Sequence, residues 1–191
     1  MLPGHVLDLF RRSGALLDGH FRLSSGLHSD AYLQCALVLQ HPRDAEALGA
    51  ALAASLRAAG VDPQAVMSPA LGGIVIGQEV GRALGVRAIF AERQDGALTL
   101  RRGFSLEAAE RVVIIEDVVT TGGSTRETMN VARAAGAAIV GAGAIIDRSD
   151  GRSDLGVPFR SLARLPVPAY PADECPLCRQ GVPIVKPGSR R

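Results

Sequence analysis

Apolar runs alternate with amphipathic stretches along the middle of the chain. Short apolar runs occur at 65–69, 86–92, 111–117 and 138–148, and stretches with helical spacing separate them at 72–85 and 122–136. In the run 111–117 both parities are apolar, so residues 112 and 114 would face one side of a strand and 113 and 115 the other. Strands buried on both faces belong to a parallel sheet covered by helices. The pattern predicts an α/β fold with an open, mainly parallel sheet flanked by helices over residues 60–150.

The flanking regions do not share this alternation. Residues 3–17 have helical spacing, residues 19–35 alternate around SSG and HSD turns as two short strands would, and residues 41–60 predict a strong helix. We expect a single domain over 1–191. In it, residues 1–40 form an N-terminal hood over one edge of the sheet, and residues 166–191 form a Pro- and Cys-containing tail.

The alternation is interrupted between residues 93 and 110. Leu98 and Leu100 alternate there with Thr99 and Arg101, which predicts a hairpin arm. The stretch is longer than most connections in α/β units, and long excursions of this kind are often flexible lids. An exposed hairpin without a role is the alternative.

The composition indicates which binding partners and which cellular compartment to expect. The 21 basic and 19 acidic residues give a net charge of +2, which is too balanced to indicate nucleic acid as a partner. No apolar run reaches the length that spans a membrane, and Asp8 makes the N-terminus a poor signal peptide. Three cysteines cannot form an even set of disulfides, so we expect a cytoplasmic protein with reduced thiols.

Two of the cysteines, Cys175 and Cys178, have the spacing of half a zinc site. A tetrahedral site needs four ligands, and the chain has no second CxxC or HxxxH. Cys35 is a third candidate, and His28 or His41 a remote fourth. The favoured interpretation is therefore a turn with two free thiols.

The stretch VVIIEDVVTTGGS, residues 112–124, carries the clearest chemistry. Glu116 and Asp117 follow an apolar strand, and ligands of parallel sheets bind beyond the carboxyl ends of strands. The loop that follows leads into a helix start, where backbone N–H groups and the helix dipole favour an anion, and its glycines let the backbone approach that anion closely. The stretch is neither a Walker loop nor a GxGxxG fingerprint. A ribose 5-phosphate would suit both halves, with hydroxyls on the acids and phosphate in the loop. A helix cap beside two solvated acids is the alternative.

This stretch resembles the phosphoribosyl pyrophosphate (PRPP) signature of the type I phosphoribosyltransferases. The resemblance implies transfer of ribose 5-phosphate from PRPP to a nitrogen base, with Mg²⁺ on the pyrophosphate and no metal held directly by the protein. It also implies the fold of that family, in which a variable hood selects the base. Three further segments resemble the orotate phosphoribosyltransferases, namely GHFRLSSGLHSDAYLQC (19–35), SPALGGI (68–74) and AIIDR (144–148).

The resemblance also implies roles for individual residues. PRPP would be bound by Glu116, Asp117, Val118, Val119, Thr120, Thr121, Gly122, Gly123 and Ser124. Orotate would be bound by Thr120, Arg148, Ser24 and Tyr32. Pyrophosphate and the lid would involve Arg93, Arg101, Arg102, Leu71 and Gly72. A planar guanidinium matches a carboxylate in two parallel bonds, so Arg148 would pair with orotate. The alternatives are that Arg148 pairs with Asp147 or Asp150 and that Tyr32 fills the hood core.

The chain departs from the resembled family in its basic residues. Where many orotate enzymes carry lysine, this chain has Ser24 in the hood, Leu71-Gly72 after the strand and only arginines in the lid, and Lys186 is its one lysine. The charge that meets pyrophosphate must therefore come from arginine, which stabilises an anion but is a poor proton donor. By likeness to dimeric relatives we expect a homodimer with shared active sites, in which Arg101 or Arg102 acts in trans.

The leading hypothesis is transfer of ribose 5-phosphate from PRPP to orotate, giving orotidine 5′-phosphate in de novo pyrimidine biosynthesis. One alternative is a purine phosphoribosyltransferase, which would need no carboxylate partner such as Arg148. The other is a PRPP-binding regulator of the same fold with a nucleic-acid output. That reading predicts an added helix-turn-helix or a broad basic face, and the balanced charge does not favour it.

Overall fold

The computed structural model describes residues 1–23 and 25–187, and its main feature is a six-stranded sheet. The strand order is β5-β4-β3-β6-β7-β8, with β5 antiparallel to its neighbour and all other pairs parallel. In chain order the strands are β3 (Ala65–Pro69), β4 (Arg87–Gln94), β5 (Ala97–Leu100), β6 (Arg111–Val119), β7 (Ala138–Asp147) and β8 (Phe159–Arg164). The predicted open, mainly parallel sheet is confirmed.

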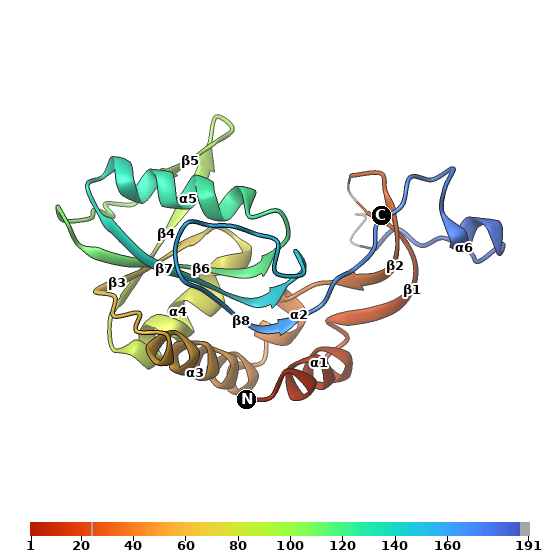
Figure 1. Ribbon diagram of the computed structural model, residues 1–191, viewed down its shortest axis with the longest axis horizontal. Coiled ribbons are helices and arrows are strands. Elements are labelled where there is room, and N and C mark those ends of the chain that lie inside the picture. The colour runs from red at the N-terminus through yellow and green to blue at the C-terminus, as the bar shows by residue number, and fades with distance from the viewer. Residues whose placement is uncertain (24, 188–191) are drawn as a thin grey trace.

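Helices cover both faces of this sheet (Figure 1). Helices α3 (Pro42–Ala58) and α4 (Gly72–Leu84) lie on one face, and α5 (Gly123–Ala134) lies on the other. Val113 and Ile115 of β6 belong to the core beneath α3 and α4, whereas Val112 and Ile114 belong to the core beneath α5. Residues at both even and odd positions of β6 are apolar for the predicted reason, because each set is buried on one face of the sheet. Burial of apolar surface is the main contribution to the stability of the fold. Within the described residues no helix is long and apolar enough to cross a membrane.

Three boundaries differ from the predicted ones. The sheet does not end within residues 60–150, because β8 adds a strand beyond them. Helix α1 (Pro3–Arg12) ends before residue 17, and its buried Val6 and Phe10 join the same core as α3, as does α2 (Ala36–Leu39). The expected hood of residues 1–40 is therefore divided, since only its strands extend away from the sheet.

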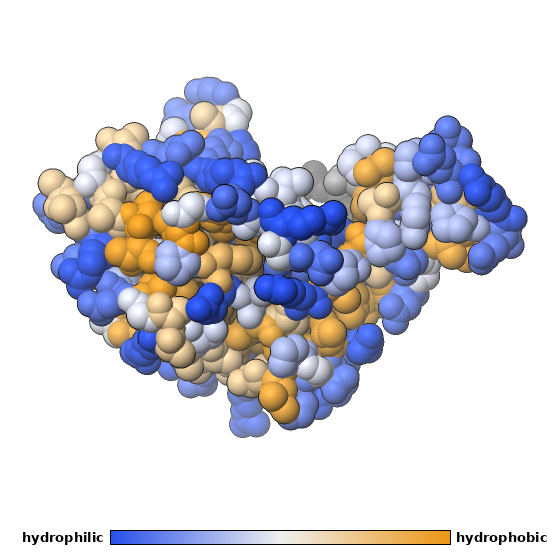
Figure 2. All heavy atoms as spheres, viewed as in Figure 1, coloured by the Kyte–Doolittle hydropathy of each residue, from blue (hydrophilic) through white to orange (hydrophobic). Residues whose placement is uncertain are grey.

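Those strands form a separate lobe with the tail (Figure 1). β1 (Leu16–Arg22) and β2 (His28–Leu33) pair antiparallel, and the Gly26 N–H donates to the Leu23 carbonyl between them. The HSD triplet lies within β2 and is not a turn. The tail, with the short helix α6 (Pro176–Arg179), adds backbone hydrogen bonds to both strands. Figure 2 shows a concave notch between this lobe and the body of the molecule.

The connections diverge at the centre of the sheet. From β3 the chain passes through α4 to β4 on one side, and from the adjacent β6 it passes through α5 to β7 on the other. Such a switch point leaves a crevice beyond the carboxyl ends of the two strands, where ligands of open α/β sheets bind. The stretch 116–124 lies at this crevice.

The predicted hairpin arm is also present. β4 and β5 are joined by Asp95 and Gly96, whose φ angles of 52° and 88° are both positive. A two-residue loop of this conformation matches the twist of antiparallel strands, and Asp-Gly is a favoured sequence for it.

Candidate active site

The crevice at the switch point is a pocket of about 270 Å³. The β3–α4 connection and the end of β6 line it together with the hairpin, through Pro69, Ala70, Gly72, Gly73, Arg93, Leu98, Glu116, Asp117 and Ser124. Helices α4 and α5 both begin at this pocket, at Gly72 and Gly123. Two helix N-termini directed at one cavity favour an anionic ligand there.

Glu116 connects the end of β6 to the first turn of α5. Its side chain is buried, and its carboxylate accepts a hydrogen bond from Ser124 Oγ at 2.6 Å and another from Thr125 Oγ1. Burial raises the pKa of Glu116 above its usual value, although the two hydroxyl donors oppose that shift. Each carboxylate oxygen has a second lone pair, so Glu116 can still accept a hydroxyl from a ligand.

Asp117 lies across the pocket from the start of α4. Its Oδ1 accepts the Val118 N–H at 2.9 Å, and its Oδ2 faces Gly72. A Cβ atom at Gly72 would lie 2.7 Å from that oxygen, so only glycine permits this approach. Burial is the main cause of a raised pKa at Asp117, with its backbone hydrogen bonds acting in the opposite direction.

The loop between these acids and α5 is shaped as an anion site. Gly122 precedes α5 with a φ of 76°, and no side chain caps the helix. The first N–H groups of a helix have no partner within the helix, so those of α5 are directed toward the loop. Thr120, Thr121 and Ser124 are exposed beside them. The loop therefore presents backbone N–H groups and hydroxyls on one side, and binding of a phosphate there stays a prediction.

Arg126 supports this loop from behind, and the sequence reasoning missed it. Its Nη2 donates to the Thr121 carbonyl and its Nη1 to the Asp154 carbonyl at 3.0 Å. A Cβ atom at Gly122 would meet the same guanidinium at 3.1 Å and Leu155 at 2.9 Å. The available signal was an arginine in the first turn of a helix, where the dipole disfavours a cation unless it has another role.

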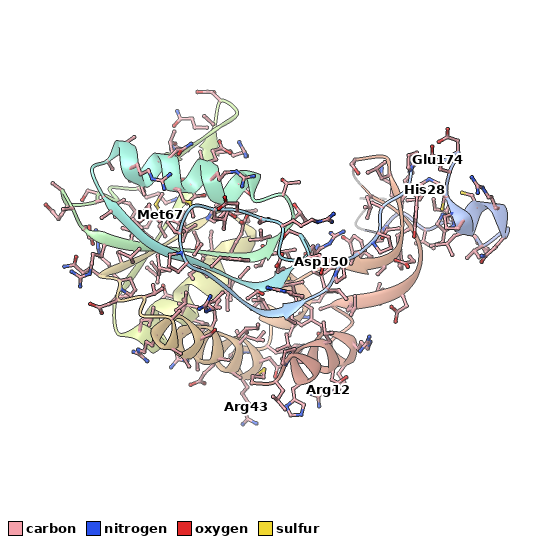
Figure 3. The ribbon with its side chains drawn as sticks, viewed as in Figure 1. Arg12, His28, Arg43, Met67, Asp150 and Glu174 are labelled. Atoms are coloured by element: carbon pink, nitrogen blue, oxygen red, sulfur yellow. The ribbon has the colours of Figure 1, made fainter. Side chains whose placement is uncertain are left out.

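A second pocket, of about 350 Å³, lies on the other side of the loop. It is lined by Thr120, Thr121, Arg148, Ser149, Arg152, Ser153 and Val167. The Arg148 N–H donates to the Val119 carbonyl at 2.8 Å, which places residue 148 directly beside the end of β6. The structure thus brings together Thr120 and Arg148, two of the residues expected at orotate. Asp150, labelled in Figure 3, marks the same loop between the body and the lobe.

Arg148 lacks the ion pair that was the alternative explanation for it. Its Nε is buried without a hydrogen-bond partner among the described residues, and the ion pair found at Asp147 is with Arg164, at 3.8 Å. Burial lowers the pKa of Arg148, but an arginine remains charged at neutral pH. A buried donor without a partner on the protein is suited to a ligand acceptor.

Asp147 orders the loop that carries Arg148. Its side chain is 1% exposed and accepts hydrogen bonds from the Ser149 N–H at 2.8 Å, Ser149 Oγ at 2.6 Å and the Gly151 N–H at 3.1 Å. The sequence reasoning considered Asp147 only as a partner for Arg148. Its role follows from the sharp turn after β7.

The lid arginines are divided between the pocket and the hairpin surface. Arg93 lines the first pocket and pairs with Glu127 at 2.7 Å. Arg101 and Arg102 pair with Glu92, at 3.9 and 2.9 Å, and line neither of the two pockets. Of the two residues expected to bind pyrophosphate after β3, Gly72 lines the pocket and Leu71 is 85% exposed.

Of the two residues expected from the hood, Tyr32 lines neither pocket in this structure. Tyr32 packs on Phe21 with 5.8 Å between ring centroids, which agrees with a hood-core role and not with stacking on a base. Ser24 lies outside the described residues.

Comparison with known proteins agrees with this geometry. Residues 37–162 match the phosphoribosyl transferase domain family. The orotate phosphoribosyltransferase of Heliobacterium modesticaldum is 55% identical over 190 residues, and that of Pelotomaculum thermopropionicum is 53% identical over 191 residues; each match covers the whole of both chains. The crystal structure of orotate phosphoribosyltransferase from Aeropyrum pernix superposes with a TM-score of 0.66 at 25% identity, covering 84% of this chain and 93% of that one. The chain therefore belongs to the phosphoribosyl transferase family, among the orotate phosphoribosyltransferases.

Proposed function

We propose that this chain transfers ribose 5-phosphate from PRPP to orotate, giving orotidine 5′-phosphate and pyrophosphate for pyrimidine biosynthesis. The observation that carries the proposal is the position of residues 116–124 between two pockets. The acids and Ser124 line the pocket at the two helix N-termini, and Thr120 and Thr121 line the pocket that contains Arg148. A sugar phosphate bound by this segment would have the leaving group on one side and the acceptor base on the other.

PRPP would be held mainly by the backbone and carboxylates of this segment. The 5′-phosphate would accept N–H groups from the start of α5, that of Ser124 among them, and hydroxyls from Thr120 and Thr121. The ribose hydroxyls would donate to Glu116 and Asp117, while Val118 and Val119 fix the position of that backbone within β6. The carboxylates and the anion site then bind different parts of one ligand.

Pyrophosphate would occupy the pocket at the start of α4. Gly72 leaves the backbone exposed there, and Arg93 supplies positive charge. The oxygens of Asp117 that face this pocket are the hard donors that Mg²⁺ prefers, so the residues present fit a magnesium ion brought with PRPP. When bound, Mg²⁺ would supply neutralisation of the charge that develops on the departing pyrophosphate.

Orotate would lie in the second pocket with its carboxylate on Arg148. The unpaired Nε suits a planar carboxylate, and Thr120 lies between the acceptor and the sugar. Orotate is already an anion, so positioning matters more for its attack on C1 of the ribose than a general base does. The protein would act through fixed charges and exclusion of water, with the hairpin as the lid.

Orotate consumption by the purified chain with PRPP and Mg²⁺ tests the reaction itself. We expect turnover with orotate and none with adenine or guanine, since neither purine offers a carboxylate to Arg148. Turnover with a purine would establish a purine phosphoribosyltransferase. Binding of PRPP without turnover of any base would instead support the regulator hypothesis.

Replacing Arg148 by alanine should impair the use of orotate. Loss of a charge-assisted hydrogen bond costs about 1.5–3 kcal/mol, so kcat/KM for orotate should fall about 10- to 150-fold. PRPP affinity, measured by calorimetry without orotate, should stay unchanged. Arg160, which is exposed on β8 and whose side chain donates to the neighbouring Phe159 carbonyl at 2.9 Å, provides the control Arg160→Ala. An equal loss of orotate use and PRPP affinity in Arg148→Ala would remove Arg148 from the base pocket.

Asp117→Asn should reduce activity but raise stability at neutral pH. Burial raises the pKa of Asp117 in the folded state. The protonated side chain therefore stabilises the fold fully below the unfolded pKa of about 3.9, and this stabilisation is lost as the pH rises through the folded pKa. The neutral amide avoids this cost, so the Tm of Asp117→Asn should exceed that of the wild type at pH 7.5, by about 2–4 °C for each kcal/mol.

The difference in Tm should disappear as the pH approaches 4, because both side chains are then neutral. Asp62→Asn, at a side chain that is 87% exposed, should change Tm little at either pH. A lower Tm for Asp117→Asn at both pH values would show that the Asp117 carboxylate stabilises the fold. It would contradict the expectation that burial of its charge destabilises the fold.

We further propose a homodimer in which the hairpin arginines serve the neighbouring subunit, because Arg101 and Arg102 line neither pocket of their own chain. Arg101→Ala/Arg102→Ala and Asp117→Asn should each be nearly inactive alone. Co-expressed with different tags, they should form heterodimers with one complete site, and a random mixture should regain about a quarter of wild-type activity. Absence of any recovery in verified heterodimers would show that the hairpin acts within its own subunit.

A further inference from the structure

Four metal-ligating side chains converge in the lobe, away from both pockets. His20 and His28 come from the two strands of the hairpin, and Cys175 and Cys178 come from the tail around α6. One ligand atom from each residue lies within 4.8 Å of all the others. In Figure 3, His28 lies on the lobe close to the tail segment that carries Glu174. We propose that these four side chains bind a structural zinc ion.

Four of the six distances between the ligand atoms are close to those of a tetrahedral site. Zn–N bonds of about 2.05 Å and Zn–S bonds of about 2.3 Å imply tetrahedron edges of about 3.3 Å for N···N and about 3.5 Å for N···S. His20 Nε2 lies 3.1 Å from His28 Nδ1. The nitrogen–sulfur distances are 3.5 Å for Cys175 to His20, 3.8 Å for Cys178 to His20 and 3.3 Å for Cys178 to His28. A single ion at the centre would satisfy all four.

A backbone contact orients His20 for this role. Its Nδ1–H donates to the Val182 carbonyl at 2.8 Å, which leaves Nε2 with its lone pair directed at the other three ligand atoms. Hydrogen bonding of the second ring nitrogen to a carbonyl is the usual way in which a metal-binding histidine is fixed. The acceptor is three residues beyond α6, so the tail supplies both two ligands and the group that orients a third.

The donor set points to zinc and to a structural role. Two thiolates and two imidazoles in a tetrahedron suit zinc, whereas magnesium and calcium prefer oxygen ligands. Four protein ligands leave no open position for water or substrate, as in structural sites. His20, His28 and Cys175 are buried, and Cys178 is the exposed member. Binding would release the thiol protons of both cysteines.

The lobe has little else to hold it together. A two-stranded hairpin is marginally stable alone, and this one has a ring contact between Phe21 and Tyr32. The tail is bonded to it through the backbone, between His28 and Tyr170 and between Val185 and residues 20 and 22. A metal ion would join these contacts into one unit and fix the hairpin that leads into the SSG turn.

Three of the four proposed ligands, Cys175, Cys178 and His28, were candidates from the sequence, whereas His20 was not. Cys35 lies at the start of α2 in the core beneath α3, and neither Cys35 nor His41 belongs to the cluster. The favoured interpretation of two free thiols in a turn did not consider His20. Cys35→Ala and His41→Gln are therefore matched controls for the true ligands.

Metal analysis of the full chain tests the proposal without reference to its activity. Protein purified without chelator, under reducing conditions and without a histidine tag should contain about one zinc ion per chain by mass spectrometry of the metal. Cobalt substitution should give the visible bands of tetrahedral Co²⁺ and the near-ultraviolet charge transfer of cobalt–thiolate bonds. Cys178→Ser and His28→Gln should each lose most of the zinc, whereas Cys35→Ala and His41→Gln should retain it.

Removal of zinc should also lower Tm, because an ion that binds only the folded state stabilises it by mass action. Zinc absent from the wild type, together with no cobalt bands on reconstitution, would overturn the proposal, as would equal zinc in wild type and Cys178→Ser. A disulfide between Cys175 and Cys178 in protein kept reduced would contradict it too. If a ligand variant fails to fold, the wild-type cobalt spectrum alone decides between four-coordinate thiolate ligation and its absence.

Discussion

The buried carboxylate of Glu116 is the contact on which the site depends. It receives hydroxyls from Ser124 and Thr125, so it holds the first turn of α5 against the end of β6. Between those two anchors the chain must reverse direction within a few residues, and Gly122 provides the left-handed conformation that allows it. Arg126 then closes the turn from behind. Without the Glu116 contact, neither the N–H groups of α5 nor the position of Thr120 between the two pockets would be fixed.

The first pocket combines the positive ends of two helices with two acidic side chains. The N-termini of α4 and α5 favour an anion in the pocket, whereas Glu116 and Asp117 disfavour one and are themselves made more basic by burial. Only a ligand that presents both hydroxyl donors and phosphate groups satisfies both sets. Burial of the two acids thus costs stability in the free protein, and under the proposed function it would provide selectivity for a phosphorylated sugar in the complex.

The sequence was most informative where local pattern and burial coincide. The double parity of residues 112–115 predicted a sheet covered on both faces, and the acids and glycines of 116–124 predicted the crevice that the structure contains. Strand β8 was missed because it is a half-exposed edge strand whose residues, FRSLAR, lack an apolar run. Arg126 and Asp147 were missed as supporting residues because most of their partners are backbone carbonyls and N–H groups, whose positions a sequence does not give.

Long-range convergence explains the remaining differences. Cys175 and His20 lie 155 residues apart in the chain, so no local spacing could show that they meet. Tyr32 had two equal explanations, and its contact with Phe21 agrees with the one that needs no ligand. Helix α1 buries Val6 and Phe10 in the same core as α3. The helical spacing of α1 predicted an apolar side but could not show which element that side packs against.

The position of the 5′-phosphate of PRPP decides most directly whether residues 116–124 act as described. A crystal structure of the full chain with PRPP and Mg²⁺ should place that phosphate on the backbone N–H groups at the start of α5, with ribose hydroxyls on Asp117 and the second pocket left for the base. A phosphate bound instead in the second pocket, against Arg148 and Arg152, would contradict this arrangement and reassign both pockets.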